Sequence, residues 1–187
     1  MKCSVFIATS VDGFIADEDG NVDWLETSGN KEADMADQAD MGFNDFIQSV
    51  DCMIMGRKTM EIISGFNLPP EQWPYGDIRI IVLSRTLKTL PDNVVNKMEL
   101  CNTPIPDLVE ELTHENFSNV YIDGGKTIQS FLNLGLISDI TLTRAPVLLG
   151  TGIPLFGKMD KEVTLTQASA TAYANDFIQE KYKVNYA

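Results

Sequence analysis

The sequence has one histidine, three cysteines and few cationic residues for its 187 positions. His114 stands in a polar stretch, so a zinc site or a Ser-His-Asp triad would depend on that one residue, and we expect neither. Cys3, Cys52 and Cys101 show no paired spacing, and two of them lie in apolar stretches. We therefore expect reduced thiols rather than disulfides, and no metal site.

Long apolar runs are also missing, and none approaches the roughly 20 residues that cross a bilayer. Lysine and arginine number 14 against 27 acidic residues, which gives a net charge of −13. A charge of this sign opposes binding to nucleic acid or to an anionic membrane. A phosphorylated ligand would need a local cluster of cations, so the positions of the few Arg and Lys are informative.

Apolar patterning predicts a single α/β domain over residues 1–187, in which strands and helices alternate. The first apolar run is a strand at 3–9 rather than a signal peptide, and we expect a cytoplasmic protein. Strands separated by helices should be mostly parallel, and the last two should form an antiparallel hairpin. The expected strands are 3–9, 51–55, 78–84, 119–123, 137–148, 162–170 and 175–185; the expected helices are 33–50, 57–64, 106–114 and 126–135; and 10–30 and 66–77 are loops.

Two standard nucleotide motifs are incomplete. Gly125-Lys126-Thr127 resembles the end of a P-loop, but Val120 occupies the position of the first P-loop glycine. Gly150 and Gly152 open like a dinucleotide fingerprint, whose third glycine would fall on Leu155. Any nucleotide site is therefore of another kind.

Three strand ends carry similar chemistry. The expected strands at 51–55, 78–84 and 119–123 lead into Gly56-Arg57-Lys58-Thr59, Ser84-Arg85-Thr86 and Gly124-Gly125-Lys126-Thr127. In a parallel sheet these turns share one edge, where open α/β sheets bind ligands. Glycines permit close backbone approach, helix starts favour anions, and Arg57, Lys58 and Arg85 could hold a phosphate monoester. We expect a nucleotide site here, although each turn alone could be only a tight turn or a solvated loop.

The motifs, in this order, resemble those of the dihydrofolate-reductase-like family, and most closely the reductase domain of riboflavin biosynthesis. The resemblance rests on segments 7–16 with Trp24, 54–61, 82–85 and 120–125, and on 135–140 and 145–156 for the riboflavin-type reductase. It implies a three-layer α/β/α fold with a central, mostly parallel mixed sheet and an antiparallel C-terminal hairpin. It also implies a homodimer; apolar residues near 137–148 could form the interface or belong to the core.

The resemblance further implies hydride transfer from NADPH, a cofactor that performs the difficult chemistry while the protein orients it. Arg57, Lys58 and Arg85 would select NADPH over NADH by binding its 2′-phosphate. The residues implied to contact NADPH are Ala8, Ile15, Gly56, Arg57, Lys58, Thr59, Leu83, Ser84, Arg85, Asp123, Gly124, Gly125, Lys126 and Thr127.

For the substrate, a small heterocycle, the family pattern points to Asp40, Thr143 and Asp12. Asp34, Asp37 and Asp45 compete with Asp40, and any of these acids could simply form the solvated face of a helix. Asp12 could instead cap its loop. The strand before Ser84 lacks the arginine that holds the glutamate of folate, with Ile78 near that place and Arg79 one residue away.

Three functions compete. The first is an NADPH-dependent reductase of a pyrimidine or pteridine, above all 5-amino-6-(5-phosphoribosylamino)uracil. The second is a dihydrofolate reductase, and the third is a protein that binds NADPH without turnover.

Overall fold

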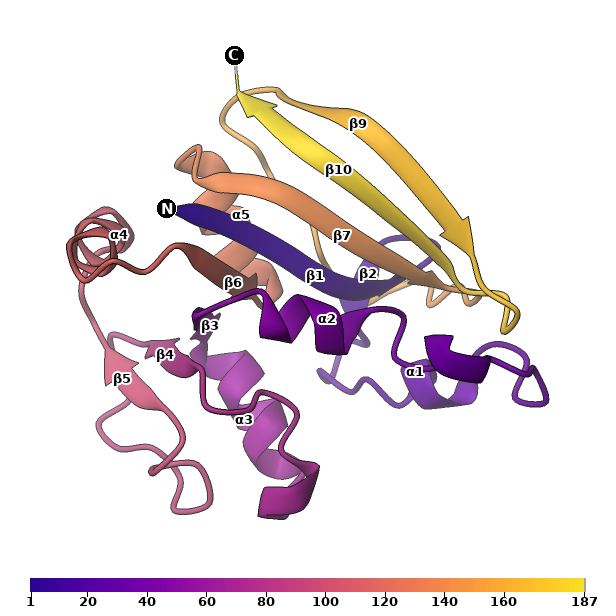
Figure 1. Ribbon diagram of the computed structural model, residues 1–187, viewed down its shortest axis with the longest axis horizontal. Coiled ribbons are helices and arrows are strands. Elements are labelled where there is room, and N and C mark those ends of the chain that lie inside the picture. Colours follow the sequence, from indigo (N-terminus) through magenta and orange to yellow (C-terminus); the bar gives the residue numbers. More distant parts are fainter. Residues whose placement is uncertain (187) are drawn as a thin grey trace.

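A computed structural model describes residues 1–186, and an eight-stranded sheet lies at its centre (Figure 1). The strands of this sheet are β1 Lys2–Ser10, β3 Cys52–Gly56, β4 Arg79–Leu83, β5 Glu99–Cys101, β6 Asn119–Asp123, β7 Ile137–Ala145, β9 Val163–Ala172 and β10 Ile178–Tyr186. Their order across the sheet is β5-β4-β3-β6-β1-β7-β10-β9. A separate two-stranded sheet joins β2 Phe14–Ala16 to β8 Ile153–Pro154.

Strand direction follows the predicted pattern. The pairings among β1, β3, β4, β5, β6 and β7 are parallel, whereas β10 pairs antiparallel with both β7 and β9. The mixed sheet and its antiparallel C-terminal hairpin are therefore confirmed. Because β1, β3, β4 and β6 are parallel, their carboxyl ends form one edge, which we call the carboxyl edge.

Helices cover both faces of the parallel half of the sheet, which confirms the three-layer architecture (Figure 1). Side chains alternate along β3, so Ile54 packs with the helices of one face and Met53 and Met55 pack with those of the other. Complete burial of such a side chain contributes roughly 1.5–3 kcal/mol to folding. On the first face lie α4 Ile105–His114 and α5 Gly125–Asn133, and on the second lie α2 Phe43–Gln48 and α3 Arg57–Gly65. Within residues 1–186, no helix has the length and apolar character needed to cross a membrane.

The single helix expected over 33–50 is wrong. The segment instead contains a 3-10 turn, Ala36–Gln38, and the short α2. The side chain of Asp40 accepts hydrogen bonds from the backbone N–H of Gly42 (3.1 Å) and of Asn44 (2.9 Å), and Gly42 adopts a φ of +83°. These side-chain hydrogen bonds replace the backbone hydrogen bonds that a helix would make here, so α2 begins only at Phe43.

Other boundaries differ for equally local reasons. The strand expected over 137–148 ends at Ala145, because Pro146 has no N–H for the ladder. The loop expected over 10–30 contains β2 and the short helix α1 Trp24–Thr27, and the one expected over 66–77 contains the 3-10 turn Pro70–Gln72. Strand β5 was not expected, because three residues are too few to show a periodic pattern.

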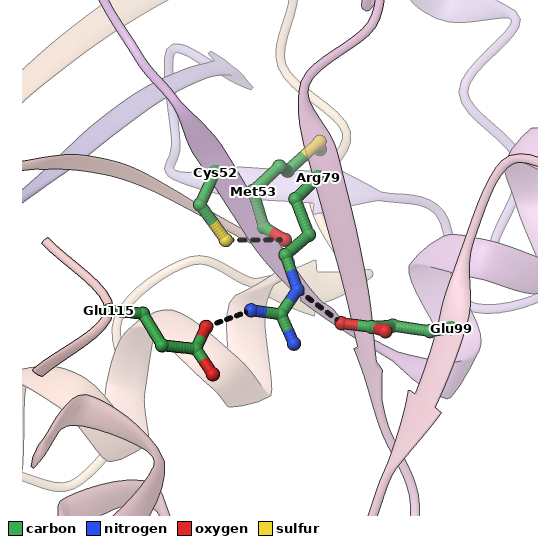
Figure 2. A network of polar contacts seen from close by, with 5 residues as sticks. All are labelled: Cys52, Met53, Arg79, Glu99 and Glu115. Carbon is green, nitrogen blue, oxygen red and sulfur yellow. Dashed lines mark hydrogen bonds and ion pairs between the residues drawn. The ribbon is translucent and has the colours of Figure 1, made fainter. Parts of the chain in front are cut away.

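A polar network closes the end of the sheet opposite the carboxyl edge (Figure 2). Arg79, the first residue of β4, donates through Nε to Glu99 on β5 and through Nη1 to Glu115 after α4. The guanidinium also lies 5.4 Å from the centre of the Phe117 ring. These contacts tie two strands and a helix together, well away from the strand ends predicted to bind a nucleotide.

The three cysteines are free thiols. Cys3 and Cys52 are buried, and burial raises the pKa of the Cys3 thiol to about 11 and that of Cys52 to about 12. Cys101 is partly accessible. The clusters of His, Cys, Asp and Glu within residues 1–186 include none arranged to hold a metal ion.

Candidate active site

A cavity of about 1190 Å³ opens along the carboxyl edge of the sheet. It exceeds the roughly 300–1,000 Å³ of a typical small-molecule site, so it has room for a cofactor and a second molecule. All of the residues predicted to contact the cofactor line this cavity, from Ala8 and Ile15 to Lys126 and Thr127. The structure thus brings together three turns that are far apart in the sequence, along with residues of β1 and β2.

The starts of α3 and α5 are held against each other by two reciprocal contacts. Gly124 precedes α5, and a Cβ atom there would lie 2.2 Å from Oγ1 of Thr59 on α3. Gly56 precedes α3, and a Cβ there would lie 2.9 Å from Oγ1 of Thr127 on α5. Gly124 also has a φ of +87°, which side chains with a Cβ rarely adopt. Glycine at position 124 lets the two helix starts approach this closely, and Gly56 leaves room for the Thr127 hydroxyl.

Two converging helix starts form a site for anions. Each helix exposes unpaired backbone N–H groups and the positive end of its dipole. Four cationic side chains line the same part of the cavity: Arg57 and Lys58 on α3, Lys126 on α5, and Arg85 after β4. Glu61 pairs with Arg57 Nε at 3.3 Å and with Lys58 Nζ at 3.2 Å. The space beside Gly56 and Gly124, which a Cβ atom would fill, and these four cations together fit the phosphates of a dinucleotide.

Asp123 ends β6 and is the only carboxyl group among residues 1–186 that lines the cavity. Burial raises its pKa to about 6, against the lowering effect of a hydrogen bond from the backbone N–H of Gly124. The carboxyl group can therefore gain or lose a proton near neutral pH. Perturbed carboxyl groups of this kind are common at catalytic sites.

Four aromatic side chains, Phe6, Phe43, Tyr75 and Tyr121, form what we call the aromatic wall of the cavity. Their sequence pattern did not single them out. A signal was nevertheless present, because Phe6 stands two residues before Ala8 and Tyr121 two before Asp123. With the two-residue period of a strand, each aromatic lies on the same face as a predicted site residue.

The three residues predicted to act on the substrate do not line the cavity. The carboxylate of Asp12 accepts hydrogen bonds from Ser10 Oγ (2.6 Å) and from the backbone N–H of Gly150 (2.8 Å) and Leu149 (3.2 Å). Asp40 accepts hydrogen bonds from the backbone N–H of Asn44, in the first turn of α2, and of Gly42, just before it, and these bonds lower the pKa of its carboxyl group. Thr143 is buried on β7, where its Oγ1 accepts from Gln179 Nε2 at 3.1 Å. Their roles in the substrate site stay predictions.

The three acids considered as alternatives to Asp40 also lie outside the cavity lining, and so does Arg79, the arginine considered for folate binding. Asp34, Asp37 and Asp45 are exposed. Arg79 stands at the other end of β4 and is already paired with Glu99 and Glu115. Arg79 is therefore engaged outside the cavity and does not replace the arginine that would hold a folate glutamate.

Comparisons with known proteins identify the family of the chain. Residues 2–179 match the model of the RibD C-terminal domain. The uncharacterized proteins YwjB and YyaP of Bacillus subtilis are 34% identical over 165 residues (88% of this chain, 87% of YwjB) and 26% identical over 185 residues (96% of this chain, 93% of YyaP). A solved structure from Shewanella sp. PV-4, named for riboflavin biosynthesis, is 35% identical, covers both chains completely and superposes with a TM-score of 0.87.

More distant structures share the fold. RibD of Acinetobacter baumannii superposes with a TM-score of 0.68 at 15% identity, and the match covers 98% of this chain but 58% of that one. A Thermotoga maritima deaminase and 5-amino-6-(5-phosphoribosylamino)uracil reductase gives a TM-score of 0.64 at 12% identity, over 97% and 56% of the two chains. The present chain therefore corresponds to somewhat more than half of each of these longer proteins.

Proposed function

Because the chain belongs to the RibD C-terminal domain family, we propose that it is an NADPH-dependent reductase of a pyrimidine- or pteridine-type substrate. The observation that carries the proposal is the joined pair of helix starts, ringed by Arg57, Lys58, Arg85 and Lys126. NADPH, when bound, would supply a hydride to the carbon of a substrate C=N bond and leave as NADP⁺.

The residues of this protein would bind the cofactor, orient it and deliver a proton to the substrate. Backbone N–H groups at the starts of α3 and α5 would hold the pyrophosphate, and Arg57, Lys58 and Arg85 would hold the 2′-phosphate. Ala8 and Ile15 give the cavity an apolar surface that suits a flat ring and excludes water. Asp123, whose pKa is raised to about 6, exchanges a proton close to neutral pH and would pass it to the substrate nitrogen.

A dihydrofolate reductase is the less favoured alternative, since the engagement of Arg79 leaves the carboxylates of folate without that partner. The uracil derivative reduced by the Thermotoga protein is the first compound to assay, because that protein shares the fold. A homodimer and a cytoplasmic location stay predictions.

Nucleotide binding tests the proposal directly. Purified protein is titrated with NADPH and with NADH while nicotinamide fluorescence is followed, alongside Arg57→Ala and Arg85→Ala. A charge-assisted hydrogen bond is worth about 1.5–3 kcal/mol, so each variant should lose about ten- to a hundredfold of the preference for NADPH. Lys88→Ala is the matched control, because Lys88 is exposed three residues from Arg85 and does not line the cavity.

The possible results separate the three functions. Binding of NADPH with oxidation by a pyrimidine or pterin supports the reductase. Oxidation that requires the glutamate tail of dihydrofolate points to the folate enzyme instead. Tight NADPH binding without turnover on any of these compounds indicates a nucleotide-binding protein, and failure to bind either nucleotide overturns the proposal.

A further inference from the structure

The cavity has two halves with different chemistry. The half at the helix starts holds the cations Arg57, Lys58, Arg85 and Lys126. The other half is formed by the aromatic wall and Asp123. The two halves arise from different positions on the chain, since the cations follow the ends of β3, β4 and β6 whereas Phe6 and Tyr121 lie within β1 and β6.

The four cations are accounted for by the cofactor. NADPH carries two phosphates in its bridge and a third on the adenosine ribose, and all of them need positive partners. Glu61 already neutralises part of the charge of Arg57 and Lys58. Within residues 1–186, no other lysine or arginine lines the cavity, so none is left for a phosphate on the second molecule.

The aromatic wall is a connected set of rings. The Phe6 and Phe43 ring centres are 5.5 Å apart at 67°, and those of Phe43 and Tyr75 are 6.3 Å apart at 76°. The hydroxyl of Tyr121 donates to the carbonyl oxygen of Phe6 at 2.9 Å, which fixes its ring against β1. Edge-to-face packing at these spacings makes a stiff apolar surface, against which a planar ring can stack.

Asp123 is the charged group of this half of the cavity. Burial raises the pKa of both Tyr75 and Tyr121, the Asp123 carboxylate raises each of them further, and no cation lowers either pKa. Lys97 touches only the outer end of the aromatic network, with its Nζ 4.2 Å from the Trp73 ring centre, and neither residue lines the cavity. A phosphate placed here would lose its water without gaining a positive partner.

We propose that the substrate of this reductase is a planar, nitrogen-containing ring that carries no phosphate, stacked on Phe6, Phe43 and Tyr75 with a ring nitrogen facing Asp123. The proposal rests on the reductase function given above and narrows its substrate class. It sets this chain apart from the phosphoribosylated substrate in the name of the Thermotoga protein.

A matched pair of fluorescent pterins tests this substrate class. Neopterin and neopterin monophosphate share one ring and differ by a single phosphate, which carries about −1.5 to −2 charges at pH 7. Each is titrated into the protein saturated with NADP⁺, so that no turnover occurs, and quenching of pterin fluorescence is followed. We expect neopterin to bind at least tenfold more tightly than its monophosphate.

A charge introduced into the wall should reverse this preference. Phe43→Lys places an ammonium group beside the ring site and should bring the monophosphate to equal or tighter binding than neopterin. Phe43→Leu is the control, because it removes the ring without adding charge and should weaken both ligands by a similar factor. NADP⁺ affinity, measured in the same samples, reports whether each variant keeps its fold.

Each outcome bears on one proposal at a time. Equal or tighter binding of the monophosphate to the wild-type protein overturns the substrate class, as does NADP⁺ binding with no affinity for either pterin. If the protein prefers neopterin but binds neither NADP⁺ nor NADPH, the reductase function is contradicted, whereas the site for an unphosphorylated ring is still supported.

Discussion

Gly124 lies so close to Thr59 that any Cβ at position 124 would stand 2.2 Å from the threonine Oγ1. We predict that Gly124→Ala forces the starts of α3 and α5 apart. Overpacking costs about 1–3 kcal/mol and an alanine at positive φ about 1–2 kcal/mol more, so the melting temperature should fall by roughly 5–15 °C. NADPH affinity should fall more than tenfold, which calorimetry of the folded variant would show.

Two further variants separate the clash from the backbone strain. Gly76→Ala also creates an alanine at positive φ, but nothing lies within 4 Å of its Cβ, so it should cost stability and leave NADPH affinity intact. Thr59→Ala combined with Gly124→Ala removes the nearest atom and should restore part of the lost stability. If Gly124→Ala binds NADPH as the wild type does, the joined helix starts are not the phosphate site.

The raised pKa of Asp123 predicts a pH effect on stability of defined sign. The folded protein holds a proton on this carboxyl group up to about pH 6, whereas in the unfolded chain the proton leaves near pH 3.8. The stabilising contribution is therefore complete below pH 3.8 and is lost as the pH rises through 6. Asp123→Asn lacks this loss, and above pH 7 it should be more stable than the wild type by roughly 1–3 kcal/mol.

Thermal unfolding of both proteins between pH 4.5 and 7.5 measures this difference. The gap between the two curves should open through the pH range of 4.5–6.5 and then stay constant. Parallel curves over the whole range would contradict the raised pKa. If Asp123 delivers the proton, the turnover number of the wild type should fall above pH 6, and Asp123→Asn should turn over more slowly at every pH without that fall.

Asp12 has hydrogen-bond partners that predict a structural effect. These bonds hold the 149–150 turn and lower the pKa of the carboxyl group from its usual 3.8. Asp12→Asn should therefore melt at a lower temperature than the wild type at pH 7. The difference in melting temperature should shrink as the pH falls below 3.8 and through the lowered pKa of Asp12, because the wild-type side chain then becomes neutral, as asparagine is. A variant that melts like the wild type but loses turnover would instead support the catalytic role predicted from the sequence.

The Arg79 network predicts an effect on stability without an effect on binding. Arg79→Met keeps the aliphatic stem but breaks the ion pairs to Glu99 and Glu115. Partly exposed pairs contribute about 0.2–1 kcal/mol each, so the melting temperature should fall by roughly 2–4 °C. NADPH affinity should change less than twofold. Reduced NADPH affinity in a variant that stays folded would show that the two ends of β4 are coupled.

Much of the fold was predictable because its elements are encoded locally. The strands at β1, β3, β4 and β6 are short apolar runs bounded by turn residues, and the helices between them force parallel pairing. The segment 33–50 was mispredicted because its apolar residues have helical spacing. In the structure the side chains of Asp34 and Asp40 each accept a hydrogen bond from the backbone N–H two residues later, and Gly42 takes a left-handed conformation. Side-chain bonding of this kind leaves no periodic trace.

The half of the cavity at the helix starts was easier to predict than the half with the aromatic wall. Its glycines and cations stand directly at strand ends, so their sequence order gives their location. Phe6, Phe43 and Tyr75 instead come from the middle of a strand, a short helix and a loop, and only tertiary packing brings them together. Asp40 was taken from the family pattern, and it lies in the segment 33–50, where the expected single helix does not form.

Because the three cysteines are unequally buried, a thiol reagent can label the cavity at a single position. Cys3 and Cys52 are shielded and held as thiols, so an alkylating reagent at neutral pH has little access to either. Cys101 is partly accessible and stands in the wall of the cavity. A maleimide dye should thus attach at one position, and the rate of its attachment becomes a direct gauge of how completely any candidate ligand fills the space beside it.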